Sequence, residues 1–357
     1  MHSISPRLRR TLFFCLLLAG ALSSCSDTAQ SGSNTSIIGT PTPNELKPIR
    51  KFPGYNIRWS KSVPSPSTLF ESEGLAANGR LYVFGGYHNK EIEASRRAYA
   101  FDPEQQRWYN LAPLPEAITH AGQALYGGKI YLAGGFVGDH PGPSTANVWI
   151  YDIANDAWSA GPALPEKLGG GALVELEGRL HFFGGTFRKD NIYLRDSPHH
   201  WVLGVAAGSS WVPAAPLPRP RNHIAGASLG GKLYAIGGQH LGEEDTGNSQ
   251  IVQVYHPRRD SWQSVARLPR PPGHISAATF VYAKQIFVVG GVTEGRAKLS
   301  EVIAYDPQTN SWGKVHNMLE ACSATVAGII GGKIVLSTGN IISGPLDTTW
   351  IGSWKSE

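Results

Sequence analysis

The chain has 357 residues, of which 41% are hydrophobic, so it is long enough to bury a core of its own. Its formal net charge is +5, but Arg7, Arg9 and Arg10 lie together at the start with no acidic residue near them. Without residues 1–24 the net charge falls to +2, so no basic stripe remains for nucleic acid and we expect no such partner.

The first 24 residues are predicted to be an export signal. The apolar run Leu12–Leu22 follows the basic start and is shorter than the roughly 20 residues that a membrane-spanning helix needs. The sequence Leu22-Ser23-Ser24-Cys25 resembles the bacterial lipobox, in which the cysteine is acylated and becomes the new N-terminus. This resemblance implies a lipid anchor on Cys25 in the bacterial cell envelope; ordinary secretory cleavage near Ala21 is the alternative. Ser26 rather than Asp after the cysteine favours outer-membrane sorting by analogy with other bacterial lipoproteins, with the leaflet unassigned.

Residues 25–53 are expected to be a flexible tether. They are rich in Ser, Thr, Pro, Gly and Asn and have few large apolar residues with which to pack. Cys15 leaves with the signal and Cys25 would carry lipid, which leaves Cys322 without an intrachain disulfide partner. The rest of the chain must therefore be stabilised by burial of its core.

Six similar stretches follow, at intervals of 48 to 53 residues. Five are apolar runs that end in Gly-Gly, and the sixth, Ile334–Asn340, has Thr338-Gly339 in place of the doublet. The five doublets begin at Gly85, Gly134, Gly184, Gly237 and Gly290. A period of this size with strands inside each unit indicates a radial array of small sheets.

One repeat, residues 220–262, shows what each unit contains. Ile224–Leu229 and Leu233–Gly238 are predicted strands joined by a Gly-Gly-Lys turn, and Ile251–Tyr255 is a third strand after a polar loop. A Pro-containing turn leads to a fourth strand that begins at Trp262. Each unit is therefore expected to be a four-stranded antiparallel meander, with its Trp packed between neighbouring sheets.

The order of Gly-Gly, an aromatic-Asp-Pro turn, Trp and Leu-Pro resembles the kelch repeat over residues 57–357. The third unit departs from this pattern because it has no Asp-Pro turn, and the sixth departs at its doublet. The sixth unit also stops before a fourth strand, while Ile57–Ser60 near the start has Trp59 in the Trp position. We expect an all-β, six-bladed propeller over residues 54–357 whose last blade is completed by the N-terminal strand, which removes an open sheet edge.

In a meander, the loop into each first strand lies on the same face as the loop between strands two and three. His120 and His223 lie fourteen residues before their doublets, and Glu71 holds the same place in the first unit. His274 matches them if its turn has two extra residues; Gly170 and Ala324 hold this place in the third and sixth units. The kelch resemblance implies that such positions point toward the channel mouth, so Glu71 and the three histidines are candidate catalytic residues around one opening.

Other candidate ligand contacts lie in the loops between strands two and three. These are His88, Arg188 and His240, together with the aromatic residues after the doublets, Tyr87, Phe136 and Phe187. The aromatic rings could stack on a sugar or could cover the top of the barrel.

The candidate residues leave several functions open. A metal site would need the three histidines around one ion, but the three units are not consecutive and a six-bladed mouth is expected to be wide, so we predict no metal and no cofactor. The first hypothesis is a monomeric, membrane-anchored module that binds a protein or a glycan through its variable-loop face. The alternative is an enzyme of the sugar mutarotase or epimerase type, which the kelch fold and the export signal suggest by resemblance to the sialic acid mutarotase and which needs one positioned acid and one base.

Overall fold

The computed structural model describes residues 48–355 except 190–191, 205, 207 and 242–246. The predicted export signal, the lipidation site Cys25 and most of the predicted tether lie outside the described residues. All the described residues belong to one compact unit.

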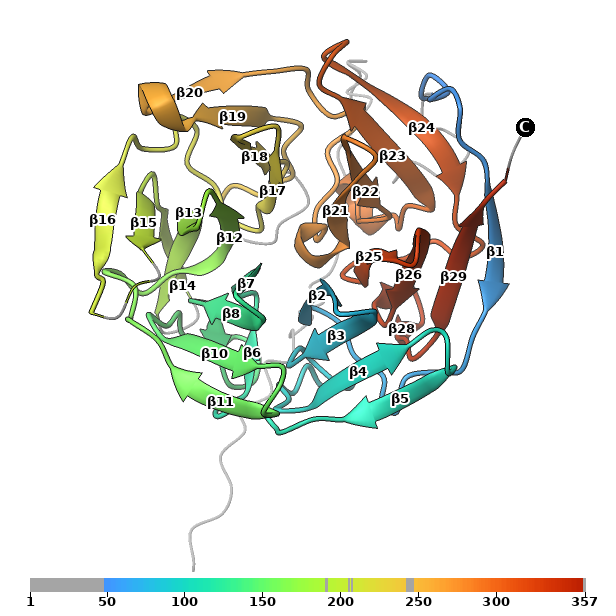
Figure 1. The fold of residues 1–357 in the computed structure, drawn as a ribbon, viewed down its shortest axis with the longest axis horizontal. Helices are drawn as coiled ribbons and strands as arrows, with labels where there is room; N and C mark the ends of the chain where they lie inside the picture. The colour runs from blue at the N-terminus through green and yellow to red at the C-terminus, as the bar shows by residue number, and fades with distance from the viewer. Residues whose placement is uncertain (1–47, 190–191, 205, 207, 242–246, 356–357) are drawn as a thin grey trace, which may run out of the picture. The chain divides into compact units, whose positions relative to one another are not determined.

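The described residues form six four-stranded antiparallel sheets around one axis, as predicted (Figure 1). We number these blades in chain order. Blade 1 contains β2 (Glu73–Ala77), β3 (Arg80–Phe84), β4 (Ala98–Asp102) and β5 (Arg107–Asn110). Blade 2 contains β7 (Gly122–Tyr126), β8 (Lys129–Ala133), β10 (Val148–Asp152) and β11 (Ala157–Ala160). Blade 3 contains β12 (Gly169–Leu176), β13 (Arg179–Lys189), β15 (His200–Gly204) and β16 (Trp211–Ala214), and β14 (Ile192–Asp196) pairs with β13.

The second half of the ring repeats this arrangement. Blade 4 contains β17 (Ala225–Leu229), β18 (Lys232–Ile236), β19 (Val252–His256) and β20 (Ser261–Ser264). Blade 5 contains β21 (Thr279–Tyr282), β22 (Gln285–Val289), β23 (Glu301–Asp306) and β24 (Ser311–Asn317). Blade 6 contains β25 (Val326–Ile330), β26 (Lys333–Ser337), β29 (Thr349–Trp354) and β1 (Ile57–Lys61). The remaining elements are short loop structures: β6 (Ile118–Thr119), β9 (Phe136–Val137), β27 (Asn340–Ile341), β28 (Gly344–Pro345) and the 3₁₀ turns η2 (Pro257–Arg259), η3 (Ser276–Ala278) and η4 (Glu294–Arg296).

The predicted closure by the N-terminal strand is confirmed. β1 pairs antiparallel with β29, with Ile57 opposite Trp354 and Trp59 opposite Gly352. The indole nitrogen of Trp59 donates a hydrogen bond to the carbonyl oxygen of Asn317 in blade 5 at 2.9 Å. The other five repeated tryptophans donate in the same way to a carbonyl in the segment that leads out of the preceding blade: Trp108 to Val63, Trp158 to Ala112, Trp211 to Pro162, Trp262 to Ala215 and Trp312 to Ala266.

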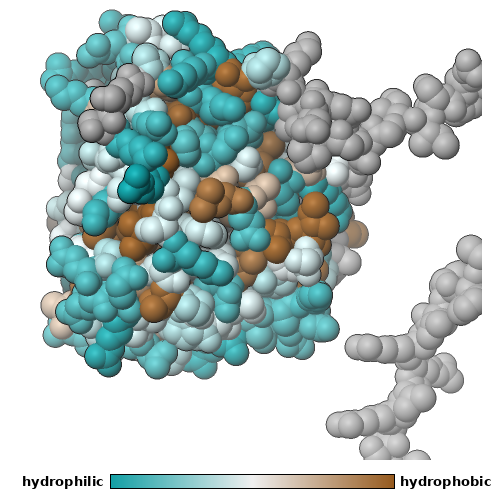
Figure 2. All heavy atoms as spheres, turned by 90° about the vertical axis from the view of Figure 1, so that its right-hand side faces the viewer, coloured by the Kyte–Doolittle hydropathy of each residue, from teal (hydrophilic) through white to brown (hydrophobic). Residues whose placement is uncertain are grey.

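The core consists of apolar layers between neighbouring blades. Phe84 and Tyr151, for example, contribute to one layer between blades 1 and 2. The Gly-Gly doublets allow close approach near the axis: Gly134 has φ +67°, and a Cβ there would lie 2.3 Å from the carbonyl oxygen of Leu168. Figure 2 shows the side of the ring that carries β1 and β24, where apolar side chains form a broken band between hydrophilic margins.

Described residues before the predicted boundary at residue 54 also contact the propeller. Phe52 is buried in the core cluster of blades 5 and 6, and its backbone N–H donates to the carbonyl oxygen of Lys314 in β24 at 2.6 Å. Ile49 packs against the neighbouring cluster. These two apolar residues dock the end of the predicted tether on blade 5. In the part of the chain that the structure describes, no helix is long and apolar enough to cross a membrane.

Candidate functional site

The six equivalent positions before the first strands share one backbone conformation. Their φ values lie between +51° and +68°, in the left-handed region that non-glycine residues seldom adopt: Glu71, His120, Gly170, His223, His274 and Ala324. The structure thus confirms that His274 is the equivalent of His120 and His223. The 3₁₀ turn η3, which directly follows in blade 5, accounts for its two extra residues.

The loops on this face pair as the meander predicts. Short antiparallel bridges join the loop into the first strand with the loop between strands two and three in the same blade: Phe70 with Tyr87, Thr119 with Phe136, Asn222 with Gln239, Gly273 with Val292, and Ser323 with Asn340. Each axis residue is therefore fixed between its own first strand and a variable loop. Backbone hydrogen bonds also link neighbouring blades, as from Gly170 N–H to the His120 carbonyl oxygen at 2.8 Å.

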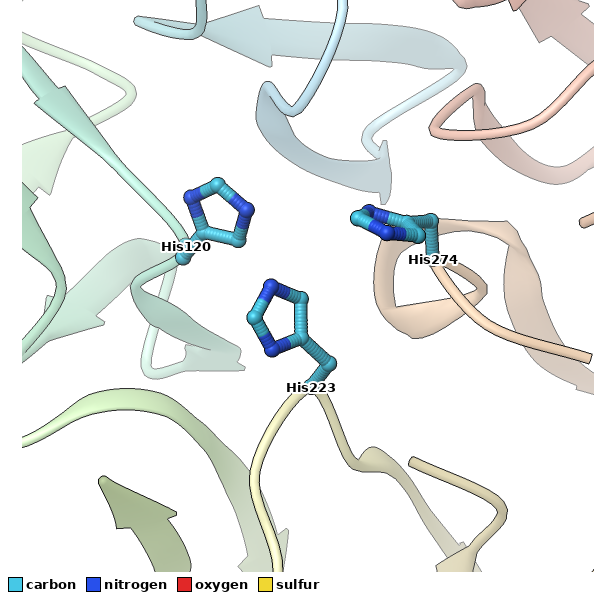
Figure 3. Close-up of side chains that lie close together, drawn as sticks. All are labelled: His120, His223 and His274. Carbon is cyan, nitrogen blue, oxygen red and sulfur yellow. The ribbon is translucent and has the colours of Figure 1, made fainter. Parts of the chain in front are cut away.

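The three histidines converge on the axis (Figure 3). One ring nitrogen from each lies within 4.8 Å of those of the other two. The ring centroids of His120 and His223 are 4.6 Å apart, and those of His223 and His274 are 5.0 Å apart. The expectation of a wide mouth was therefore wrong, because left-handed backbones on non-consecutive blades aim these side chains at one point. The expected width of the mouth was one of the two arguments against a metal, and that argument no longer holds.

Neighbouring polar groups contact all three rings, and His274 Nε2 lies 3.2 Å from Gln239 Nε2. His120 Nδ1 lies 2.8 Å from Thr119 Oγ1, and His223 Nδ1 contacts Asn222 Oδ1. The Asn222 amide is itself fixed, because its nitrogen donates to Asp196 Oδ1 at 2.6 Å. These contacts leave the Nε2 atoms of His120 and His223 turned toward the axis, as Figure 3 shows.

Glu71 joins the cluster from blade 1. Its carboxylate lies 3.4 Å from His120 Nε2 and contacts His274 Nδ1. Glu73, two residues later, is 1% exposed and accepts a hydrogen bond from the Ala121 N–H at 2.7 Å. Burial raises the pKa of Glu73 well above its ordinary value. The two carboxyl groups therefore differ in environment: Glu71 contacts the imidazoles, whereas Glu73 supports the backbone beside His120.

Two cavities lie on either side of this cluster. The innermost strands of the six blades line an axial channel of about 520 Å³. On the variable-loop face, a second cavity of about 190 Å³ has His274 and Glu71 in its wall. Its other polar lining comes from blades 4 to 6: Gln239, Asn248, Thr293, Arg296, Lys298, Ser323 and Asn340. We call this second cavity the loop-face pocket.

Sequence reasoning missed the cationic side of this pocket. Lys298 Nζ donates to Ser323 Oγ at 2.8 Å, and burial lowers the pKa of Lys298. Arg296 is exposed and has φ +61°. The only signal in the sequence was a pair of basic residues in the loop between strands two and three of the fifth unit.

Other predicted ligand contacts lie below the surface. Tyr87 and Phe136 are 2% and 0% exposed, so their rings cover the top of the barrel rather than offer a stacking face. Arg188 is 1% exposed; its Nε donates to the Gly142 carbonyl oxygen at 2.7 Å, and its guanidinium carbon lies 3.4 Å from the Phe136 ring centre. These three residues form the framework under the loops of blades 1 to 3.

The remaining candidates stay near the surface but apart from the axis cluster. The His88 ring contacts the Glu93 carbonyl oxygen at 2.9 Å, within its own loop. His240 has a side chain that is 68% exposed and lies 2.7 Å from Asp196. Phe187 is half-buried on β13, beside a bulge in its pairing with β14. None of these three lines either of the cavities beside the axis cluster.

The fold, the bridging tryptophans and the glycine doublets define a β-propeller built from repeated four-stranded meanders. The kelch-motif family model matches residues 73–115, 120–165, 220–269 and 276–319, just over half of the chain. The chain belongs to the kelch-repeat family. The family model does not match blades 3 and 6, the two units whose sequences depart from the kelch pattern.

Similar proteins come from distant organisms. The chain is 27% identical to the kelch-like protein terF of Aspergillus terreus over 77% of this chain and 61% of that one. It is 24% identical to the kelch repeat-containing protein At3g27220 of Arabidopsis thaliana over 82% of this chain and 74% of that one. The solved structure of YjhT matches with a TM-score of 0.67 and 14% identity, over 82% of this chain and 99% of that one, which shows the shared fold. The chain thus spans about three fifths of the fungal relative's length.

Proposed function

We propose that this protein is a ligand-binding module whose loop-face pocket takes one acidic sugar residue of a glycan. Kelch propellers commonly bind protein partners, and the finer proposal rests on the lining of this pocket. Its volume of about 190 Å³ is below the 300–1,000 Å³ or so of drug-sized ligand sites, which suits a single sugar ring.

The polar lining of the pocket supports this ligand class. Gln239, Asn248 and Asn340 bring amide groups, which pair with sugar hydroxyls as donors and acceptors. Lys298 and Arg296 bring positive charge to one wall, where a carboxylate would be favoured. The single observation that carries the proposal is this pairing of cations and amides in a sugar-sized cavity.

The test is a binding measurement with the full chain in detergent, against glycans that end in an acidic sugar and matched glycans that end in a neutral one. We expect selective retention of the acidic set, lost in Lys298→Met. Lys232→Met is the matched control, because Lys232 lies at the tight turn on the opposite face. Equal binding of both glycan sets, or retention only of a protein partner, would refute the glycan proposal.

A second candidate function is sugar mutarotation in the same pocket. The contact between Glu71 and His274 in the pocket wall favours it, since one group would take the proton of the anomeric hydroxyl while the other gives a proton to the ring oxygen. The C–O ring bond breaks, the open-chain sugar forms, and the reverse steps close the other anomer.

Equilibration of an anomerically pure sugar, followed by NMR, tests this reaction. Acceleration by the wild type that is lost in both Glu71→Gln and His274→Ala, and kept in His88→Ala, would support it. If the wild type accelerates no acidic or neutral sugar, the pocket only binds.

We also propose that the propeller is exported and held at the bacterial cell envelope by lipid on Cys25. The Leu-Ser-Ser-Cys segment supports this proposal. Metabolic labelling with a fatty acid should mark the wild type and not Cys25→Ala, and the variant should leave the membrane fraction. Unchanged fractionation of the variant would contradict the anchor.

A further inference from the structure

We infer that His120, His223 and His274 form a binding site for one divalent first-row transition-metal ion. The three imidazoles come from blades 2, 4 and 5 and meet on the propeller axis (Figure 3). One nitrogen from each lies within 4.8 Å of those of the other two. This inference goes beyond the proposed function, because it concerns the axis itself and holds whether or not a sugar enters the pocket.

The spacing is close to what an ion needs. Zinc–imidazole bonds of about 2.0–2.1 Å in a tetrahedral site place the ligand nitrogens about 3.4 Å apart. The observed separations of up to 4.8 Å would close by small rotations of the rings about their side-chain bonds. The backbones that carry the rings need not move.

The hydrogen-bond partners select the correct form of two imidazoles. The Asn222 nitrogen donates to Asp196, so Asn222 Oδ1 must accept from His223 Nδ1–H. Thr119 Oγ1 donates to the Tyr87 hydroxyl at 3.3 Å, which leaves it to accept from His120 Nδ1–H. Both rings thus keep the lone pair of Nε2 on the axis side. Outer contacts of this kind orient the histidines of known metal centres.

Burial and charge also suit a cation. His120 and His223 are 8% and 3% exposed, so water is largely kept from the ring faces. The Glu71 carboxylate lies 3.4 Å from His120 Nε2 and contacts His274, which places one negative charge beside the ion. Imidazole ligands favour zinc, copper, nickel or iron over magnesium and calcium, which prefer oxygen. Three histidine ligands would leave a fourth coordination position open, and His274 also lies in the wall of the loop-face pocket.

The experiment uses the full chain in detergent, purified without a polyhistidine tag, stripped with a chelator and dialysed. Zn²⁺ is titrated by calorimetry and Co²⁺ by visible absorption. We expect one ion per chain and the intense visible bands of four-coordinate Co²⁺. His223→Ala should lose this binding, and His316→Ala, which removes an imidazole on β24 away from the axis, should keep it.

A second variant separates a metal site from a general weakening of the fold. Asn222→Ala keeps all three histidines but removes the group that orients His223, so the affinity should fall about 10- to 100-fold with the stoichiometry unchanged. Circular dichroism checks that each variant is folded, and His120→Phe replaces His223→Ala if the latter fails to fold. Absence of stoichiometric binding by the wild type, or equal affinity in His223→Ala and His316→Ala, would overturn the inference.

Discussion

Removing the Trp59 side chain should destabilise the protein about as much as removing an equivalent tryptophan inside a continuous blade. Trp59 is half-buried on β1, its Nε1–H bonds to Asn317 at 2.9 Å, and its ring covers Gly352, where a Cβ would meet it at 2.8 Å. Truncating a fully buried Trp costs about 3–5 kcal/mol, so a half-buried ring with one hydrogen bond should cost about 2 kcal/mol. In a chain of this size that is a loss of about 4 °C in melting temperature.

Thermal unfolding followed by far-ultraviolet circular dichroism provides the measurement. Trp108→Ala is the matched control, because Trp108 is also half-buried and donates to Val63 at 3.3 Å, but its strand β5 continues directly from β4. Similar losses in the two variants are expected. If Trp108→Ala lowers the melting temperature and Trp59→Ala does not, the N-terminal strand does not close the ring.

Three further predictions concern buried titratable groups. Burial lowers the pKa of His181 to about 3 and of His200 to about 4, so only the unfolded chain binds these protons as pH falls below about 6.5. Urea unfolding should therefore show that the free energy of unfolding decreases from pH 7 to pH 5. The decrease should be smaller in the double variant His181→Gln/His200→Gln. The raised pKa of Glu73 gives stability the opposite pH dependence. Its stabilising contribution is complete below about pH 4.5 and is lost as pH rises toward the folded-state pKa. In the same assay, the stability of Glu73→Gln relative to wild type should therefore increase with pH. Burial raises the pKa of Cys322 to about 12, so iodoacetamide should label it at neutral pH only when the chain unfolds; rapid labelling of the folded protein would contradict this.

The glycine doublets and tryptophans predict most of the fold because the doublets recur in five of the six blades and a tryptophan recurs in every blade, each for a geometric reason. The doublets permit close backbone approach near the axis, and each indole bridges to a carbonyl leading out of the blade before it. Trp59 could be assigned to the last blade from its sequence context alone. The docking of Phe52 on β24 could not be predicted, since a single Phe in a polar segment gives no periodic signal.

The candidate site was only partly predictable. Equivalent positions in a repeat predicted that Glu71 and the three histidines lie around one opening, and all four share the left-handed backbone. Their separation depends on where the side chains point, which spacing along the chain does not give. The burial of individual side chains could not be predicted from the sequence either. Phe136 and Phe187 both follow their doublets, yet Phe136 lies under the Arg188 guanidinium and is fully buried, whereas Phe187 is half-buried.

Gly170, the axis residue of blade 3, gives the histidines their room, and enlarging it should disturb His223 specifically. Gly170 has φ +68°, and a Cβ there would lie 2.7 Å from the His223 backbone nitrogen and 3.3 Å from its Nδ1. Gly178 in the same blade has φ +77° but only the Tyr126 hydroxyl within 4 Å, at 3.9 Å. Both alanine variants carry the left-handed cost of about 1 kcal/mol, and Gly170→Ala adds an overpacking cost of about 1–3 kcal/mol. Urea unfolding should therefore give a lower free energy of unfolding for Gly170→Ala than for Gly178→Ala. NMR should show shifted His223 ring resonances in Gly170→Ala alone. Equal stability with an unmoved His223 resonance would mean that the axis is looser than the structure shows, and the convergence of the three imidazoles would then not be fixed by the backbone.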